Sequence, residues 1–475
     1  RRRYVRRERP PLDPQSCSID TEVMLGRMRA LLLAGVTAAA TPALMQHFGW
    51  RLWQLVALGV WLTTDALIWL VSCVLRQRRP AQQPHQQKRT AGLSRAGSSS
   101  DWGSSTLFSA PPVSRVVIAP DGCQLHVLDF EAEAEDGCTR GVVVCGHAMF
   151  VNSTTLARAD RDCVTATLVK RGLRVLAVDL RGRRRSVAPQ RSSGEGATEG
   201  VDITHDYSER NPCYHRPQDS EGRPVFTYEQ SVADVSLFIQ LARELQPGAP
   251  VYLLGHSIFS HLFLAHLGQV PKEEQPDGIV ALASGVWLPK LMNWKMWWRC
   301  FMSMTVMRVL SSWHHSFPAK FLGLGSEDEK SALAKDIAHF WKQDEWQSPS
   351  DGSVCFRDNL RNIKCPMLLV FSCEDTTIPV DYAERFFSPV LQDSQHHLVV
   401  MEGDRDLHTP ASPSVATEPS SLVSVLMLED SARCPASLRQ TRRFPGHMEL
   451  TTSPKTAPVW EHVAQWLVQR GPPPS

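Results

Sequence analysis

Residue types that together attack carbonyl groups occur in this chain next to predicted strands. Ser257 lies between the apolar run 251–254 and a helical pattern, where a sharp strand-to-helix turn would lift its hydroxyl above a sheet. Asp375 follows the apolar run 367–371, and His447 precedes the last helical pattern. A serine in this place is also a common helix N-cap, so the case for nucleophilic chemistry depends on the whole set.

Two backbone amides complete the set of groups that acyl chemistry needs. The segment that contains His147 and Met149 closes an earlier strand, and Ile258 follows Ser257 at the start of a helix. The N–H groups of Met149 and Ile258 are therefore predicted to form an oxyanion hole for a tetrahedral intermediate.

Buried strands that alternate with helices are predicted to position these residues. Short apolar runs rich in β-branched residues alternate with amphipathic helical patterns such as Tyr228–Leu245. Continuous apolar strands separated by helices predict an α/β protein with a mostly parallel sheet covered by helices on both faces. The runs are 116–118, 124–130, 141–145, 173–179, 251–254, 278–282, 367–371 and 398–401.

From about residue 115 to residue 468 the sequence resembles the α/β-hydrolase superfamily, and most closely its monoacylglycerol lipase and serine aminopeptidase-like branch. The order Ser, Asp, His along the chain is the order that this family shows. The resemblance implies that Ser257 attacks a carbonyl, His447 relays the proton and Asp375 orients the imidazole. The resembling motifs are GHAMF at 146–150, VLAVDLRG at 175–182, GHSIFS at 255–260, EDTTIP at 374–379 and FPGHMEL at 444–450.

Two positions of the implied triad have alternatives. Glu374 and Asp381 lie near Asp375, which best matches the family's spacing before Ile-Pro. His408 follows the last predicted strand and is the alternative catalytic histidine. His447 is preferred because its Gly-His-Met-Glu context and its distance from the terminal helix fit the family pattern.

The sequence departs from the family at three places. Phe259 stands where the nucleophile motif has a small residue, His147 is followed by alanine instead of glycine, and Arg183-Arg184 replaces the usual His-Gly. A bulky ring in a tight turn could displace the Ser257 hydroxyl, and an error of about 1 Å can lower a rate roughly a hundredfold. The alternative function is therefore a catalytically impaired α/β-hydrolase-fold protein that binds or regulates.

The predicted domain is interrupted three times. Residues 113–286 and 353–475 form the two parts of the core, and residues 287–352 form a helical cap rich in Trp and Met. So many large apolar side chains in a small cap favour a small apolar ester as substrate. The polar stretch 187–225 is predicted to be a loop insertion and 404–440 a low-complexity insertion.

The N-terminal part of the chain has a different composition. Residues 1–100 contain 15 Lys and Arg against 5 Asp and Glu, a net charge of +10, so the other 375 residues carry −8. We predict a basic tail (1–22), a membrane anchor (23–79) and a flexible linker (80–112). Within the anchor the 24-residue stretch 52–75 is long enough to span a bilayer.

The topology of the anchor depends on a second apolar stretch, residues 30–45. It reads either as the first arm of a membrane hairpin, which we favour, or as a signal peptide. Arginines are dense on both sides of the hairpin, so the positive-inside rule places both chain ends and the catalytic domain in the cytosol. The predicted partner of this part is a lipid membrane.

Other classes of function are not favoured. Twelve cysteines occur without any CxxC spacing, which argues against a disulfide scaffold or a zinc finger. We expect no metal and no cofactor, because the adjacent histidine pairs 314–315 and 396–397 would point to opposite faces of a strand. The basic residues at 1–9 lack the aromatic or fold context of nucleic-acid binding. The oligomeric state is not predicted.

Overall fold

The structure, a computed structural model, covers the predicted catalytic domain. It describes residues 107–134, 137–183, 186, 202–206, 226–313, 316–372, 374–391, 397–402, 423–429 and 446–470. The predicted tail, membrane anchor and most of the linker lie outside these residues. Among the helices that the structure describes, none combines the length and the hydropathy that crossing a bilayer requires.

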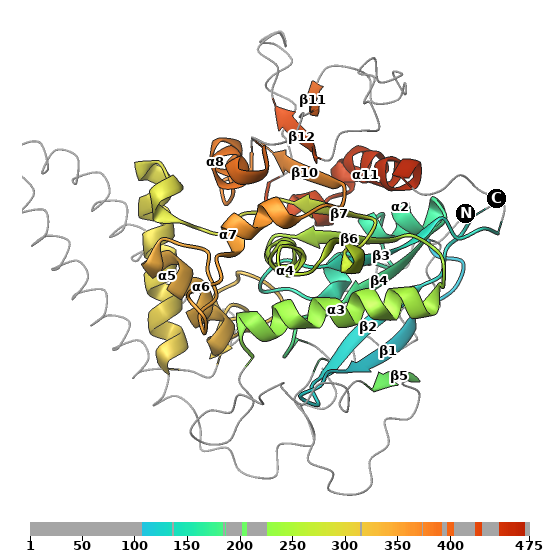
Figure 1. The fold of residues 1–475 in the computed structure, drawn as a ribbon, viewed down its shortest axis with the longest axis horizontal. Helices are drawn as coiled ribbons and strands as arrows, with labels where there is room; N and C mark the ends of the chain where they lie inside the picture. The colour runs from blue at the N-terminus through green and yellow to red at the C-terminus, as the bar shows by residue number, and fades with distance from the viewer. Residues whose placement is uncertain are drawn as a thin grey trace, which may run out of the picture. The chain divides into compact units, whose positions relative to one another are not determined.

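A single large sheet organises the described domain (Figure 1). Its order is β11-β12-β10-β7-β6-β3-β4-β2-β1-β5. Only β2 runs antiparallel to its neighbours β1 and β4; the other paired strands are parallel. The strands are β1 (Val113–Ile118), β2 (Gln124–Phe130), β3 (Gly141–Gly146), β4 (Leu173–Val178), β5 (Asp202–Asp206), β6 (Val251–His256), β7 (Gly278–Leu282), β10 (Met367–Ser372), β11 (His397–Glu402) and β12 (Val423–Glu429).

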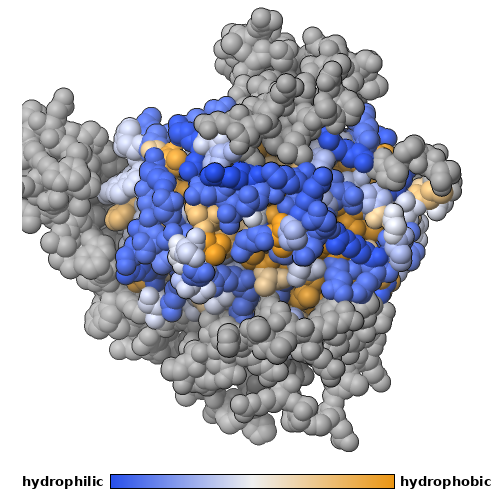
Figure 2. Space-filling model, in the orientation of Figure 1, coloured by the Kyte–Doolittle hydropathy of each residue, from blue (hydrophilic) through white to orange (hydrophobic). Residues whose placement is uncertain are grey.

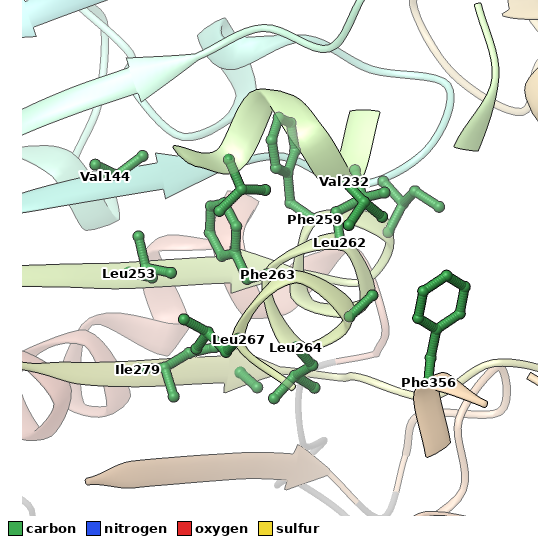
Figure 3. Packing of buried hydrophobic residues seen from close by; sticks show 14 of the residues in the cluster. Val144, Val232, Leu253, Phe259, Leu262, Phe263, Leu264, Leu267, Ile279 and Phe356 are labelled. Atoms are coloured by element: carbon green, nitrogen blue, oxygen red, sulfur yellow. The ribbon is translucent and has the colours of Figure 1, made fainter. Parts of the chain in front are cut away.

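Helices cover both faces of this sheet, which confirms the predicted α/β class with a mostly parallel sheet. Alternate residues of a strand face opposite sides, so Val144 packs in one core cluster and Val143 in the other. Figure 3 shows Val144, Leu253 and Ile279 packed against the residues of α4. The helices on that side are α3 (Tyr228–Leu245), α4 (Ile258–Leu267) and α8 (Val380–Leu391), and those on the other side are α2 (Val164–Lys170) and α11 (Ala457–Arg470).

The outer surface of the domain is polar where α3 covers the sheet. Figure 2 shows this face as mostly hydrophilic, with hydrophobic residues visible in patches between the elements. The amphipathic pattern of α3 explains this arrangement, because Val235, Phe238 and Leu241 turn inwards. A Thr227–Gln230 capping box fixes the start of the helix.

The segment between β7 and β10 forms a helical layer at the end of the sheet. It contains α5 (Trp294–Trp313), the short strands β8 (Ser316–Phe317) and β9 (Glu329–Lys330), and α6 (Ser331–Gln343). Met304 and Met307 of α5 pack against Phe317 and Ala334 in a small core of their own. We call this layer, residues 287–352, the cap.

Two segments predicted as insertions contribute strands to the sheet. Within 187–225, β5 pairs with the edge strand β1, and within 404–440, β12 lies between β10 and β11. The sequence VSVLMLE of β12 is apolar and partly β-branched, which suits a strand of a parallel sheet. The composition of the whole 404–440 segment conceals this short run.

Candidate active site

Ser257 lies at the turn that joins β6 to α4. Its φ of 55° and ψ of −112° place it in a strained backbone region that non-glycine residues rarely adopt. Gly255 makes the turn possible, because a Cβ atom there would lie 2.5 Å from the Ser260 amide nitrogen. The Ser257 N–H donates to the Leu282 carbonyl at 3.0 Å, which fixes the turn to the end of β7. Such local strain is typical of functional residues.

The bulky residue in this turn does not displace the serine. Phe259 is 1% exposed. Its ring makes edge-on contact with His147 at a centroid distance of 5.0 Å and packs against Phe263 at 5.4 Å. The ring therefore lies in the core next to β3, and the position of the Ser257 hydroxyl is compatible with catalysis.

Ser257, His447 and Asp375 form one hydrogen-bonded chain. His447 Nε2 lies 3.0 Å from Ser257 Oγ, and His447 Nδ1 lies 2.8 Å from Asp375 Oδ2. Since a carboxylate only accepts hydrogen bonds, His447 Nδ1 carries the proton and Nε2 is left to accept from the serine hydroxyl. This arrangement can activate a serine as a nucleophile.

The surroundings of Asp375 identify it as the acidic residue that is hydrogen-bonded to His447. Asp375 is 1% exposed, and its other oxygen accepts the backbone N–H groups of Thr377 at 2.7 Å and Ile378 at 3.0 Å. Of the two alternatives, Glu374 is exposed and Asp381 forms an exposed ion pair with Arg385. Neither of these two carboxylates is part of the hydrogen-bonded set of Ser257, His447 and Asp375. The alternative histidine, His408, lies outside the described residues.

The residues of the predicted oxyanion amides lie on elements next to the serine turn. Ile258 is the first residue of α4, and the first N–H groups of a helix have no partner within it. Met149 follows β3 and lines the same cavity as Ser257 and His447. The oxyanion role of the two amides stays a prediction.

A second histidine, which the sequence analysis did not single out, holds the backbone of His447. Burial lowers the pKa of His256 well below its ordinary value, so its ring is neutral and has one N–H. His256 Nε2–H donates to the His447 carbonyl at 3.0 Å, and the Thr451 hydroxyl lies 3.1 Å from His256 Nδ1. No pattern in the sequence indicated this role, because it joins residues 191 positions apart.

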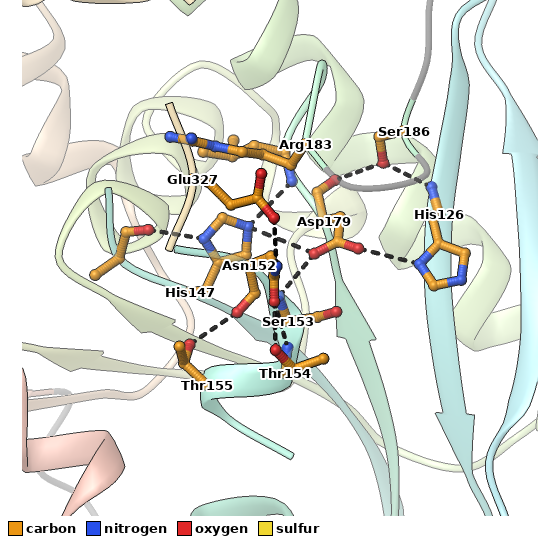
Figure 4. Close-up of polar contacts among 12 residues, drawn as sticks. His126, His147, Asn152, Ser153, Thr154, Thr155, Asp179, Arg183, Ser186 and Glu327 are labelled. Carbon is orange, nitrogen blue, oxygen red and sulfur yellow. Dashed lines mark hydrogen bonds and ion pairs between the residues drawn. The ribbon is translucent and has the colours of Figure 1, made fainter. Parts of the chain in front are cut away.

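A buried polar network supports the loop after β3 (Figure 4). Asp179 accepts the Ser153 N–H at 2.7 Å and lies 3.0 Å from His126 Nδ1. His147 accepts the Leu180 N–H at Nε2, at 3.3 Å. Burial lowers the pKa of His147 from 6.5 to about 4, so this ring is neutral and hydrogen-bonded at physiological pH.

The same region connects the core to the cap. Arg183, which replaces the family's histidine, forms an ion pair with Glu329 and donates to the Asp328 carbonyl at 2.5 Å. Arg183 and Glu329 are each 1% exposed. Asn152 adds a hydrogen bond to Glu327 at 2.7 Å. This departure from the family pattern therefore has a structural partner, which sequence reasoning missed.

The serine opens into a cavity of about 650 Å³ between the core and the cap. Helix α5 supplies much of its apolar wall, and the remainder comes from the loops that carry the catalytic residues. Among the described residues, no group of three or more His, Cys, Asp or Glu side chains is placed to hold a metal ion. The apolar residues that line the cavity include Met149, Trp287, Met302, Met304, Met307, Phe317, Leu322, Leu324, Ile337 and Phe340.

Comparison with known proteins shows what part of this domain is similar to. Residues 138–340 match the family model described as serine aminopeptidase, S33. No curated protein sequence matches the chain. Similar solved structures include a soluble variant of monoglyceride lipase from Saccharomyces cerevisiae in complex with a substrate analog, at 12% identity, 77% of this chain, 98% of that chain and a TM-score of 0.47.

Two further structures have the same range of similarity. The monoacylglycerol lipase of Paleococcus ferrophilus is 13% identical, with 73% of this chain and 99% of that chain covered and a TM-score of 0.39. A thermophilic esterase from Thermogutta terrifontis is 14% identical, with 76% of this chain and 100% of that chain covered and a TM-score of 0.41.

Proposed function

We propose that this chain, which belongs to the α/β-hydrolase superfamily on its serine aminopeptidase-like branch, is a serine hydrolase that cleaves carboxylic esters of apolar acyl groups. One observation carries the proposal. The hydrogen-bonded chain of Ser257, His447 and Asp375 opens into a largely apolar cavity beneath the cap. Because a fold by itself does not fix a function, the proposal rests on this site.

In the proposed mechanism Ser257 Oγ attacks the ester carbonyl while His447 Nε2 takes the hydroxyl proton. The N–H groups of Met149 and Ile258 stabilise the oxyanion of the tetrahedral intermediate. His447 then gives its proton to the leaving alcohol, and the acyl group stays on Ser257. Water, deprotonated by His447, attacks the acyl-enzyme, which releases the carboxylic acid and restores the serine.

We also propose that the N-terminal stretches 30–45 and 52–75 anchor the domain to a membrane with both chain ends in the cytosol. Arginine clusters flank the apolar stretches on both sides, as the positive-inside rule expects for such a hairpin. Epitope tags at residue 1 and residue 475 should then be digested by protease from the same side of sealed vesicles. Digestion from opposite sides would contradict the hairpin.

A fluorophosphonate probe tests the catalytic proposal, because it reacts only with an activated serine. The full chain in nonionic detergent should be labelled, and the Ser257→Ala and His447→Ala variants should not. Ser303→Ala is the matched control, since Ser303 lines the same cavity on α5. Loss of either catalytic residue should lower kcat on p-nitrophenyl octanoate by about 10⁶-fold. Labelling that persists in Ser257→Ala would refute Ser257 as the nucleophile. Absence of labelling in the wild type would refute the proposal and favour the binding-protein alternative.

A further inference from the structure

One cationic side chain lines the cavity of the proposed active site. Among the described residues that form its wall, Arg299 is the one with a permanent positive charge. Arg299 is exposed on α5, and its guanidinium donates to the carbonyl oxygen of Thr376. This acceptor is neutral, so the hydrogen bond positions the guanidinium without neutralising its charge. Within the part of the chain that the structure describes, no carboxylate forms an ion pair with Arg299.

Arg299 lies on the side of the cavity where the alcohol part of the ester would leave. Thr376 follows Asp375, whose carboxylate orients His447, and His447 must deliver a proton to the leaving alcohol. The leaving alcohol therefore lies beside His447. Arg299 is hydrogen-bonded to Thr376, the neighbour of Asp375 in the chain, and so lies near His447 and the leaving alcohol.

The opposite end of the cavity is apolar. Met307 lies eight residues after Arg299 on the same helix, which corresponds to about 12 Å along the axis. Met307 packs against Phe317 of the cap, and both residues line the cavity. The cavity thus offers an apolar wall for an acyl chain and a guanidinium for the other end of the substrate.

We infer that Arg299 determines specificity by binding a negatively charged group on the alcohol part of the ester. The inference rests on the proposed ester hydrolysis and names its substrate class as anionic amphiphiles, such as acyl esters of glycerol phosphate. A guanidinium has five N–H donors in a planar fork that matches phosphate oxygens. In the structure one N–H group of Arg299 donates to Thr376, so other donors remain for such a group.

The test compares two esters that differ by one phosphate group. The full chain in nonionic detergent should hydrolyse octanoyl glycerol 3-phosphate with a kcat/KM about tenfold to a hundredfold above that for octanoyl glycerol, the range expected of a charge-assisted hydrogen bond. In Arg299→Gln the ratio of the two kcat/KM values should fall to about one, and in Arg299→Lys it should stay between that value and the wild-type value. Equal kcat/KM values for the two esters in the wild type would overturn the inference.

Two controls separate specificity from stability and from general charge. Arg308 is exposed on the same helix but does not line the cavity, so Arg308→Gln should leave the ratio unchanged. An equal loss for both esters in Arg299→Gln would show a structural role through Thr376 and would also overturn the inference. The ratio should fall with added salt, since the preference is electrostatic.

A binding measurement distinguishes failure of this inference from failure of the proposed function. In Ser257→Ala neither ester can be cleaved, and calorimetry gives the Kd of each. Absence of Ser257-dependent turnover with all esters would refute the hydrolase proposal, whereas a tighter Kd for the phosphate ester that requires Arg299 would still support anion recognition. Equal Kd values for the two esters would overturn it.

Discussion

The ring of Phe259 occupies the space that the absent side chain of Gly146 leaves. A Cβ atom built on Gly146 would lie 2.1 Å from Cγ of Phe259 and 2.5 Å from its Cβ. The large residue in the serine turn is thus accommodated by a glycine at the end of the neighbouring strand β3. This pairing explains how the turn keeps its geometry without the small residue that the family pattern has.

Gly146→Ala should therefore destabilise the protein and lower its activity. Overpacking of a buried site is expected to reduce the free energy of unfolding by about 1–3 kcal/mol. The loop that carries His147 and Met149 begins at Gly146, so the same clash should also lower kcat. Denaturant unfolding and the hydrolysis of p-nitrophenyl octanoate measure the two effects.

The double variant Gly146→Ala/Phe259→Ala is the matched control. Phe259→Ala alone should lower the free energy of unfolding by about 3–5 kcal/mol, because it leaves a cavity. The methyl group that Gly146→Ala adds should then fit into this cavity without a clash. The effect of Gly146→Ala should thus be smaller in the Phe259→Ala background than in the wild type. Strictly additive effects would show that the two residues do not interact.

Asp375→Asn should lower kcat by about 10⁴-fold with little change in KM. An amide in place of the carboxylate can hold the imidazole in the wrong tautomer, and in a serine triad the corresponding change has an effect of this size. The neighbouring Glu374→Gln is the control, because Glu374 is exposed and should have near wild-type kcat. A large loss in Glu374→Gln with an active Asp375→Asn would reverse the assignment.

The helices and strands could be predicted from the sequence better than the contacts between residues on different elements. Buried apolar runs and amphipathic helices are local patterns, so the sheet, α3 and the strand ends that carry Ser257 and Asp375 could be located. The partnership of Phe259 with Gly146 depends on which strands are neighbours, and no local pattern contains that information. For the same reason the departure at Arg183 could be noticed but not explained, since its partner Glu329 is 146 residues away.

Breaking the buried pair of Arg183 and Glu329 should be strongly destabilising. Glu329→Gln leaves the Arg183 charge buried without its counter-ion, which is expected to lower the free energy of unfolding by about 3–5 kcal/mol. The double variant Arg183→Met/Glu329→Leu should recover most of this loss, because an apolar pair of similar size avoids the unpaired charge. Denaturant unfolding measures both variants.

The exposed pair of Asp381 and Arg385 is the control for this experiment. Both side chains are about half exposed, so Asp381→Asn should change the free energy of unfolding by less than about 1 kcal/mol. If Glu329→Gln were as mild as Asp381→Asn, the pair between the core and the cap would contribute little to stability.

A buried histidine on α4 should make stability depend on pH. His266 is 8% exposed, and burial lowers its pKa from 6.5 to about 4. Between these values the unfolded chain takes up a proton at His266 that the folded protein does not, so the unfolding free energy falls as the pH decreases from 6.5 towards 4. This one residue should account for a loss on the order of 3 kcal/mol across that window. His266→Gln cannot take up the proton, so its unfolding free energy should fall less than that of the wild type over the same pH range. Parallel curves for the two proteins, measured by denaturant unfolding at each pH, would show that His266 is protonated equally in both states.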